Sequence, residues 1–271
     1  MKETDFTIVV PVCGEEDLYR FKLILFPTIR HFFSKSDIFV ITPRQSPASF
    51  HSSIFIIRDE ELINSEIRAG WLKQQILKLL VHRFVTSHWY LVLDSDCFFT
   101  RHCSPKDFFV NDKARVNLST GHDTWWKSAS RFTGYAIPSP RCGVTPMLLH
   151  TCVVKELCSS LDVERAILSC NCTEYSLYWT YLHHFHTLTD YYVFSNQYSV
   201  SNHEIWHNSS TARMRYRRFL QLVTKNIEKS HQDSRTFLSL IQSTLTKEFS
   251  HISPYLQIDD ISSAVRHCLL L

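Results

Sequence analysis

The stretch that decides the fold is YLVLDSDCFF, at residues 90–99. Its four apolar residues lead directly into two acids, Asp94 and Asp96, which are separated by one serine. A short continuous apolar run is typical of a strand that is buried on both faces, as in a parallel sheet. Side chains alternate along a strand, so the two carboxylates share one side and can reach the same ion or its water shell. The stretch therefore predicts a buried strand that ends in a cation or phosphate site. The simpler alternative is a polar turn, which Asp and Ser also favour.

The chain before this stretch predicts three strands and two helices. Apolar runs predict strands at residues 6–12, where Pro11 marks the end, and at residues 37–41 and 53–57. Acids at residues 15–17 precede apolar residues at helical spacing, and a long amphipathic helix is predicted from Gly70 to Leu80. The order strand, helix, strand, strand, helix, strand is that of an α/β domain, and its fourth strand carries the two acids.

The chain after this stretch is less regular. Residues 121–143 contain Trp125, Trp126 and Tyr135 and predict a long aromatic loop, which is either a binding loop that suits carbohydrate or a segment whose tryptophans simply pack. A helix is predicted to start at residues 145–150 and another at residues 173–179, and a late strand at residues 191–194.

Composition indicates a folded protein of one domain, or of one domain with a tail. The chain has 271 residues, 44% of them hydrophobic and 20% charged, and its net charge of +3 does not suggest a nucleic-acid partner. No apolar run approaches the roughly 20 residues that span a bilayer, and the first residues lack the pattern of a signal peptide. Nine cysteines without repeated spacing are expected to be reduced thiols. We therefore expect a cytoplasmic protein.

Five motifs follow one another along most of the chain. They are a Gly-Trp-x-x-Gln-Gln helix, the Asp-x-Asp stretch, a Thr-Pro pair, a Glu-Tyr pair and a late Ile-Gln-Ser element: Gly70 to Gln75, Asp94 to Asp96, Thr145-Pro146, Glu174-Tyr175 and Ile241 to Ser243. This ordered set resembles GT-A glycosyltransferases, and most closely a bacterial GT-A-like family of unknown function, DUF6492. The resemblance implies a Rossmann-like α/β fold with a mixed sheet flanked by helices. The expected catalytic domain covers residues 1–210, with a nucleotide-binding half at about 1–100, an acceptor half at about 101–210, and an extension at 211–271 packed on the same domain.

The resemblance also implies roles for single residues. The donor would be a nucleotide-diphosphate sugar, and the residues matched to its pocket are Pro11, Val12, Asp59, Lys73, Gln74 and Asp94. Asp94 and Asp96 match the metal and diphosphate motif for Mn²⁺ or Mg²⁺, with Asp94 nearer the ribose or sugar, and His203 is preferred over His207 as a further ligand.

The acid matched to the acceptor side of the site is Glu174. It would be the base that deprotonates the acceptor hydroxyl in an inverting enzyme, or a positioning group in a retaining one. The expected acceptor is a carbohydrate or a lipid-linked glycan. The arginines from Arg213 to Arg218 are either a solvated helix face or a contact with phosphate or with acidic lipid at the inner face of the membrane.

Three other functions compete with the metal-dependent transferase. A HAD-type phosphatase also has Asp-x-Asp after an apolar strand, but usually on its first strand and with Thr or Val where this chain has Phe98. A sugar nucleotidyltransferase usually carries a Gly-rich basic loop after its first strand, whereas residues 12–16 are acidic with one glycine. A non-catalytic binding protein would have no need of two carboxylates together at a strand end.

Overall fold

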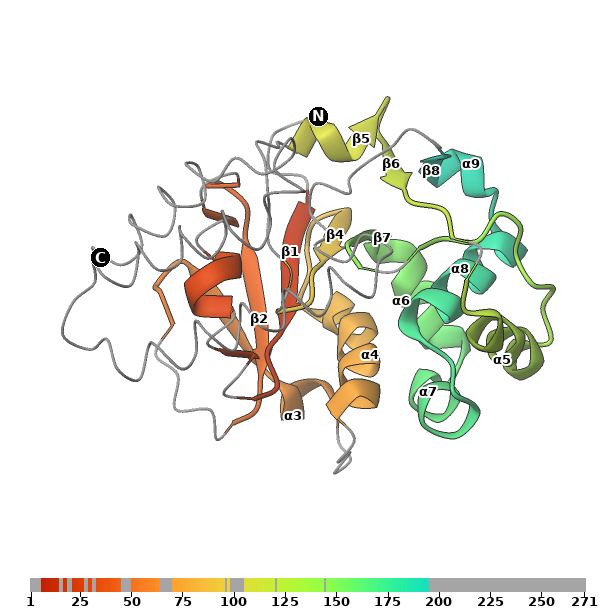
Figure 1. The fold of residues 1–271 in the computed structure, drawn as a ribbon, viewed down its shortest axis with the longest axis horizontal. Coiled ribbons are helices and arrows are strands. Elements are labelled where there is room, and N and C mark those ends of the chain that lie inside the picture. The colour runs from red at the N-terminus through yellow and green to blue at the C-terminus, as the bar shows by residue number, and fades with distance from the viewer. Residues whose placement is uncertain are drawn as a thin grey trace, which may run out of the picture. The chain divides into compact units, whose positions relative to one another are not determined.

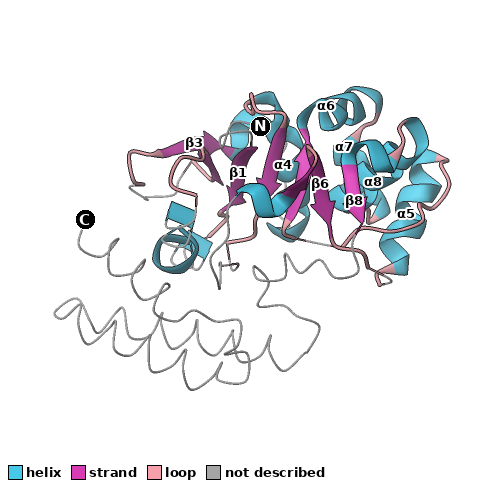
Figure 2. Ribbon diagram, turned by 90° about the horizontal axis from the view of Figure 1, so that it is seen from above, coloured by secondary structure: helices cyan, strands magenta, loops and turns pink. Residues whose placement is uncertain are grey.

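The computed structural model describes the following parts of the chain, shown in Figures 1 and 2: residues 6–14, 17–18, 21–26, 29–30, 33–44, 50–63, 70–95, 97, 105–119, 121–143 and 145–194. The chain divides into two compact units. The first comprises residues 1–13, 36–94 and 108–198, and the second comprises residues 14–35, 95–107 and 199–271. The extension predicted at 211–271 lies outside the described residues.

The first unit is built on a five-stranded sheet in the order β3-β2-β1-β4-β7. β1 to β4 are parallel to one another, and β7 pairs antiparallel with β4. The strands are β1 Phe6–Pro11, β2 Ile38–Thr42, β3 Ile54–Arg58, β4 Trp89–Val92 and β7 Met147–His150. The mixed sheet flanked by helices confirms the predicted α/β class, and the four strands predicted up to residue 93 are confirmed.

The continuous apolar runs form the two central strands because both of their faces are covered. All residues of β1 and of β4 are buried. In the sheet, Ile8 lies between Ile38 of β2 and Leu91 of β4, and Leu91 in turn lies opposite Leu148 of β7. This register fixes where each strand ends.

Helix α4 contacts α6, α7, α8 and strand β1, and α6 also contacts α8 and β7 (Figure 1). The helices are α3 Asp59–Leu62, α4 Gly70–Leu80, α5 Asp123–Thr133, α6 Thr151–Ser160, α7 Val163–Cys170, α8 Glu174–Phe185 and α9 Leu188–Tyr191. A 3₁₀ turn, η2 Val81–Arg83, continues α4, and another, η3, spans Pro105–Phe108. A second sheet has the order β5-β6-β8, with β5 Phe109–Val110, β6 Lys113–Val116 and β8 Tyr192–Phe194.

The predicted helix from Gly70 to Leu80 is α4, with the same first and last residues. Its apolar positions Ile76, Leu79 and Leu80 are buried as expected. Trp71 differs, because 47% of it is exposed and its ring lies 6.0 Å from that of Trp125. The helix therefore enters the core only after its first turn.

The prediction of a helix that starts at residues 145–150 was wrong. These residues lead into strand β7, and the helix that follows, α6, begins at Thr151. Met147 lies opposite Val92, so the apolar run of β7 covers the free side of β4. A short apolar run suits a helix or a buried strand equally well, and pairing with β4 decides between them.

The long irregular loop predicted at residues 121–143 was also wrong, because its first half forms helix α5. The helix has Asp123 in its first turn and ends at Gly134, whose φ of 76° is the left-handed cap that glycine favours. Trp126 and Ala129 point into the protein, three residues apart on one face. The tryptophan packing that the sequence left open therefore holds for Trp126.

The second unit contains the segment of helical spacing near the N-terminus. Phe21–Leu25 is a π-helical turn, and both of these residues are fully buried, as is Ile29. In the same unit, Ser95 Oγ donates to Asp17 Oδ1 at 2.9 Å. The predicted apolar stripe is thus confirmed at these three positions.

Two further expectations concern the described residues only. No helix among them has both the length and the apolar character needed to cross a bilayer. Among the described cysteines, Cys142, Cys152, Cys158, Cys170 and Cys172 are free thiols.

Candidate functional site

The candidate site lies where β1 and β4 end side by side. The chain moves from β1 outward through β2 and β3 on one side, and β4 lies on the other side of β1. Such a reversal of strand order is the place where open α/β sheets bind ligands, at the carboxyl ends of the strands. Pro11 ends β1, Val12 follows it, and both are buried. Leu93, which donates its N–H to the carbonyl of Val9 at 3.0 Å, leads from β4 to Asp94. The structure thus brings Pro11, Val12 and Asp94 to one place.

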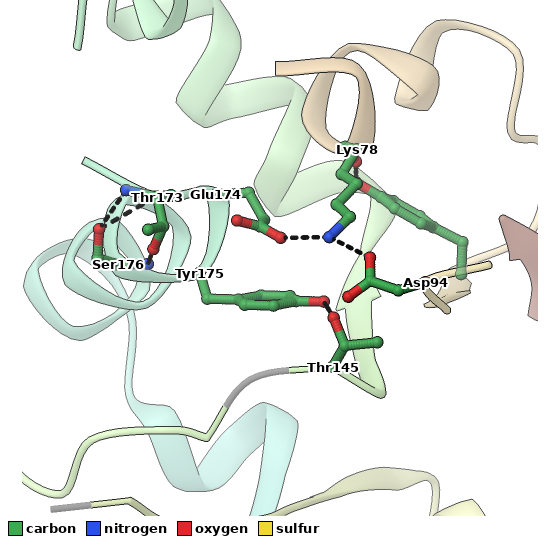
Figure 3. Close-up of polar contacts among 8 residues, drawn as sticks. Lys78, Asp94, Thr145, Thr173, Glu174, Tyr175 and Ser176 are labelled. Carbon is green, nitrogen blue, oxygen red and sulfur yellow. Dashed lines mark hydrogen bonds and ion pairs between the residues drawn. The ribbon is translucent and has the colours of Figure 1, made fainter. Parts of the chain in front are cut away.

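Asp94 is joined to Glu174 through a buried lysine that the sequence analysis did not select. Lys78 Nζ lies 2.7 Å from Asp94 Oδ1 and 3.0 Å from Glu174 Oε1, and Figure 3 shows the three side chains in a row. Lys78 is 2% exposed and Glu174 is 1% exposed, whereas 35% of the Asp94 side chain is exposed. The row therefore leads from the core to the surface, and only its last member meets solvent.

The second contact of Glu174 comes from Gln75, one turn before Lys78 on α4. The Gln75 amide faces the carboxylate, and the orientation that satisfies both groups has its nitrogen donating to Oε1 at 3.3 Å and also to Oε2. Residues three apart share a helix face, so Gln75 and Lys78 point together at the start of α8. Both carboxylate oxygens of Glu174 then accept hydrogen bonds from α4.

Glu174 is the first residue of α8, and local contacts hold it there. Thr173 caps the helix: its Oγ1 accepts from the N–H of Ser176 at 3.1 Å, and Ser176 Oγ accepts from the N–H of Thr173 at 2.9 Å. Tyr175 and Thr145 share a hydrogen bond of 2.8 Å between their hydroxyl groups, which ties the first turn of α8 to the segment before β7. The acid also gains from the helix dipole, which favours negative charge at this end.

Burial and charge act in opposite directions on this cluster. Burial raises the pKa of Glu174 above its ordinary value, and the nearby Lys78 ammonium only partly offsets that rise. For Lys78 burial alone would lower the pKa, but the carboxylates of Asp94 and Glu174 outweigh burial, so its pKa is raised well above its ordinary value. Lys78 therefore stays charged at neutral pH.

Lys73 and Asp59, which the sequence analysis matched to the nucleotide pocket, contact each other. Lys73 Nζ lies 2.6 Å from Asp59 Oδ2, and Asp59 opens α3 directly after β3. Gln74 is half-buried on the same turn of α4 as Lys73. Of the expected set, Asp59 and Lys73 thus form a pair at the end of β3.

The model of a family of unknown function, DUF6492, matches residues 3–260. The chain belongs to this family. The match includes α4, Asp94 and Glu174, which carried the predicted resemblance. No curated protein matches the chain in sequence.

The described part of this DUF6492 chain holds one donor for the expected metal. Among the described residues, no group of three or more His, Cys, Asp or Glu side chains could hold a metal ion. Asp94 offers its outer oxygen, while Asp96, His203, His207 and the arginines from Arg213 to Arg218 lie outside the described residues. A metal bound here would therefore need ligands in addition to Asp94.

Lys78 is the site residue that the sequence analysis missed, and Gln75 was named there only as the last residue of the Gly-Trp-x-x-Gln-Gln motif. The signal is present in the sequence, because Lys78 interrupts the apolar run Ile76-Leu77 and Leu79-Leu80. Every residue from Gln75 to Leu80 is buried, so this half of α4 has no polar face for a lysine. A charged residue at such a position needs a buried partner of opposite charge.

Proposed function

We propose that the chain is a metal-dependent glycosyltransferase with a GT-A fold, which transfers a sugar from a nucleotide-diphosphate donor to a glycan or lipid-linked acceptor. The observation that carries the proposal is the place of Asp94. It is a partly exposed carboxylate at the reversal point of a parallel sheet, directly beside the end of β1. The ordered motifs of the sequence support the same function.

The described residues divide the work as follows. Pro11 and Val12 lie at the carboxyl end of β1, where a nucleotide would bind. Asp94 would hold Mn²⁺ or Mg²⁺ through its outer oxygen, together with Asp96 and a histidine, for which His203 is the choice. A divalent ion bound there would supply positive charge to the diphosphate leaving group. The cytoplasmic location, with contact to the membrane surface through Arg213 to Arg218, is part of the same proposal.

The test is the thermal unfolding of the purified chain with UDP, GDP, CMP or TDP, each with and without Mn²⁺. A ligand that binds only the folded state, present at a concentration of about a hundred times its dissociation constant, adds about 2.7 kcal/mol to the free energy of unfolding. This raises the melting temperature by roughly 5–10 °C for a chain of this size. We expect one nucleotide to raise the melting temperature only when Mn²⁺ is present. No rise with any pair would refute the transferase and favour a binding protein for another ligand.

A matched pair of variants locates the effect. Asp94→Asn should abolish the nucleotide-dependent rise, since it removes the charge at the carboxyl end of β4. Asp37→Asn changes an exposed acid just before β2, at the amino ends of the parallel strands, and should leave the rise in melting temperature unchanged. Slow hydrolysis of the matching nucleotide sugar, dependent on Mn²⁺ and lost in Asp94→Asn, separates an enzyme from a protein that only binds.

A further inference from the structure

The carboxylate of Glu174 is enclosed on all sides. Glu174 is 1% exposed, its Oε1 lies 3.0 Å from Lys78 Nζ, and the Gln75 amide covers both of its oxygens. A general base must come within hydrogen-bond distance of the proton that it removes. A carboxylate without an exposed oxygen, held by two side chains of α4, has no such access to an acceptor hydroxyl.

Lys78 is enclosed as well, and its contacts have a direction. Its ammonium group has three N–H donors and is placed between Glu174 on its inner side and Asp94 on its outer side. Tyr90, on the strand that leads to Asp94, donates from its hydroxyl to the backbone carbonyl of Lys78 at 3.0 Å, which fixes the turn of α4 against β4. The lysine is therefore held at both its backbone and its side chain.

Asp94 is the member of the row that can meet a ligand. Its Oδ1 is occupied by Lys78 at 2.7 Å, and 35% of its side chain is exposed. A carboxylate with one oxygen fixed has little rotational freedom, so the direction of the other oxygen is set before any ligand arrives. The cost of ordering that group is then met by folding and not by binding.

We infer that Glu174 and Lys78 are positioning residues that fix the carboxylate of Asp94, and that Glu174 is not the base for the acceptor. Glu174 anchors Lys78, and Lys78 holds Asp94. The role of Asp94 in nucleotide and metal binding rests on the proposed function. The alternative is that Lys78 only neutralises Glu174 in the core and that its contact with Asp94 has no consequence.

A paired substitution distinguishes these two roles. Lys78→Met combined with Glu174→Gln removes the buried cation and the buried anion together, so little buried charge is left unpaired. We expect this double variant to melt within a few degrees of the wild type but to lose the rise caused by a nucleotide with Mn²⁺, as Asp94→Asn does. Lys155→Met, at an exposed position of α6, is the matched lysine control and should keep the rise. A double variant that keeps the full rise overturns the inference.

The single substitution Glu174→Gln tests the inference that Glu174 is not the general base. The substitution keeps the shape of the side chain and an oxygen for Lys78, so Asp94 should remain held. We expect turnover of the nucleotide sugar to stay within about tenfold of the wild type, because removing a general base costs about 10²–10⁴ in rate. A loss of about a hundredfold or more in kcat, with KM and the nucleotide-dependent rise unchanged, would make Glu174 the base.

A measurement without any ligand keeps the inference apart from the proposed function. Melting temperatures of Lys78→Met, Asp94→Asn and the combination of both form a cycle. We expect the combined loss to be smaller than the sum of the single losses, because Lys78 and Asp94 are in contact. Additive losses would overturn the positioning role. If the losses are not additive but no nucleotide raises the melting temperature, the contact between Lys78 and Asp94 is supported and the transferase function is refuted.

Discussion

Replacing Lys78 with methionine should make the stability of the protein depend strongly on pH. The substitution keeps most of the apolar stem and removes the ammonium group that lies between Asp94 and Glu174. Glu174 is left buried without a counter-charge, whereas Asp94 can be hydrated because 35% of its side chain is exposed. The energetic consequence therefore falls on Glu174.

The size of the effect follows from the burial of the pair. Removing one partner of a buried ion pair costs about 3–5 kcal/mol when the other partner stays charged, which is roughly 6–20 °C in melting temperature for a chain of this size. Burial already raises the pKa of Glu174 in the wild type, and loss of Lys78 removes the interaction that opposes this rise. A carboxyl group whose pKa is raised on folding binds more protons folded than unfolded, so its contribution is present at low pH and is lost as pH rises through the folded pKa.

The assay is chemical denaturation of Lys78→Met and wild type at pH 5 and at pH 8. We expect the variant to lose at least about 1 kcal/mol more at pH 8 than at pH 5, because one proton per pH unit is worth about 1.4 kcal/mol. Adding Glu174→Gln should remove this difference. A loss that is equal at both pH values, or larger at pH 5, would show that Glu174 carries no buried charge and would refute the reasoning.

Three further predictions concern other parts of the first unit. Burial, with a smaller contribution from nearby histidine charges, lowers the pKa of His150 from 6.5 to about 4, so wild-type stability should fall by up to about 3 kcal/mol between pH 6.5 and pH 4, and His150→Gln should flatten this profile in denaturation measurements. Gly134→Ala should cost about 1 kcal/mol because the residue has a φ of 76°, while Gly121→Ala, whose Cβ would lie 3.6 Å from its nearest neighbour, should cost little. Trp126→Ala removes a ring that is 4% exposed and should cost about 3–5 kcal/mol, whereas Trp71→Ala, at 47% exposed, should lower the melting temperature much less.

The sequence was sufficient for the parallel half of the fold. Continuous apolar runs mark β1, β2, β3 and β4. All residues of β1 and β4 are buried, because both faces of these strands are covered, whereas Phe55 and Ile56 of the edge strand β3 are exposed. Helix α4 was also predicted to the residue, since its start at Gly70 and its apolar spacing are local signals. The position of Asp94 could be predicted by the same reasoning, because a residue directly after a buried parallel strand lies at the carboxyl end of the sheet.

Elements that depend on distant partners were missed. The run before His150 fits a helix as well as a strand, and it is a strand because β4 needs a neighbour on its free side. Residues 123–133 form a helix although their composition is mostly polar. Trp126 and Ala129 of this helix are buried, and α5 contacts α7 and α8. Local pattern carries no information about either partner.

Local sequence pattern also led to the wrong lysine of α4 for the group around Asp94. Lys73 was selected because it lies within the Gly-Trp motif, but at that turn the helix is still near the surface and the lysine pairs with Asp59. Lys78 lies further along, where all residues are buried, and there a charge requires a buried partner. That partner, Glu174, is 96 residues away in sequence and is supplied by the packing of α8.

Strand β7, which the sequence did not predict, helps to fix the position of Asp94, which the sequence did predict. Leu91 lies opposite both Ile8 and Leu148, so β1 and β7 together set the register of β4 and hence the position of Asp94. A slip of one residue would turn every side chain of β4 to the other face, and would move the site with it. The segment before β7 contributes a second constraint, because Thr145 holds Tyr175 beside Glu174. Asp94 and Glu174 therefore reach the same lysine only when β7 is in place, and no local sequence pattern around either acid can express that requirement.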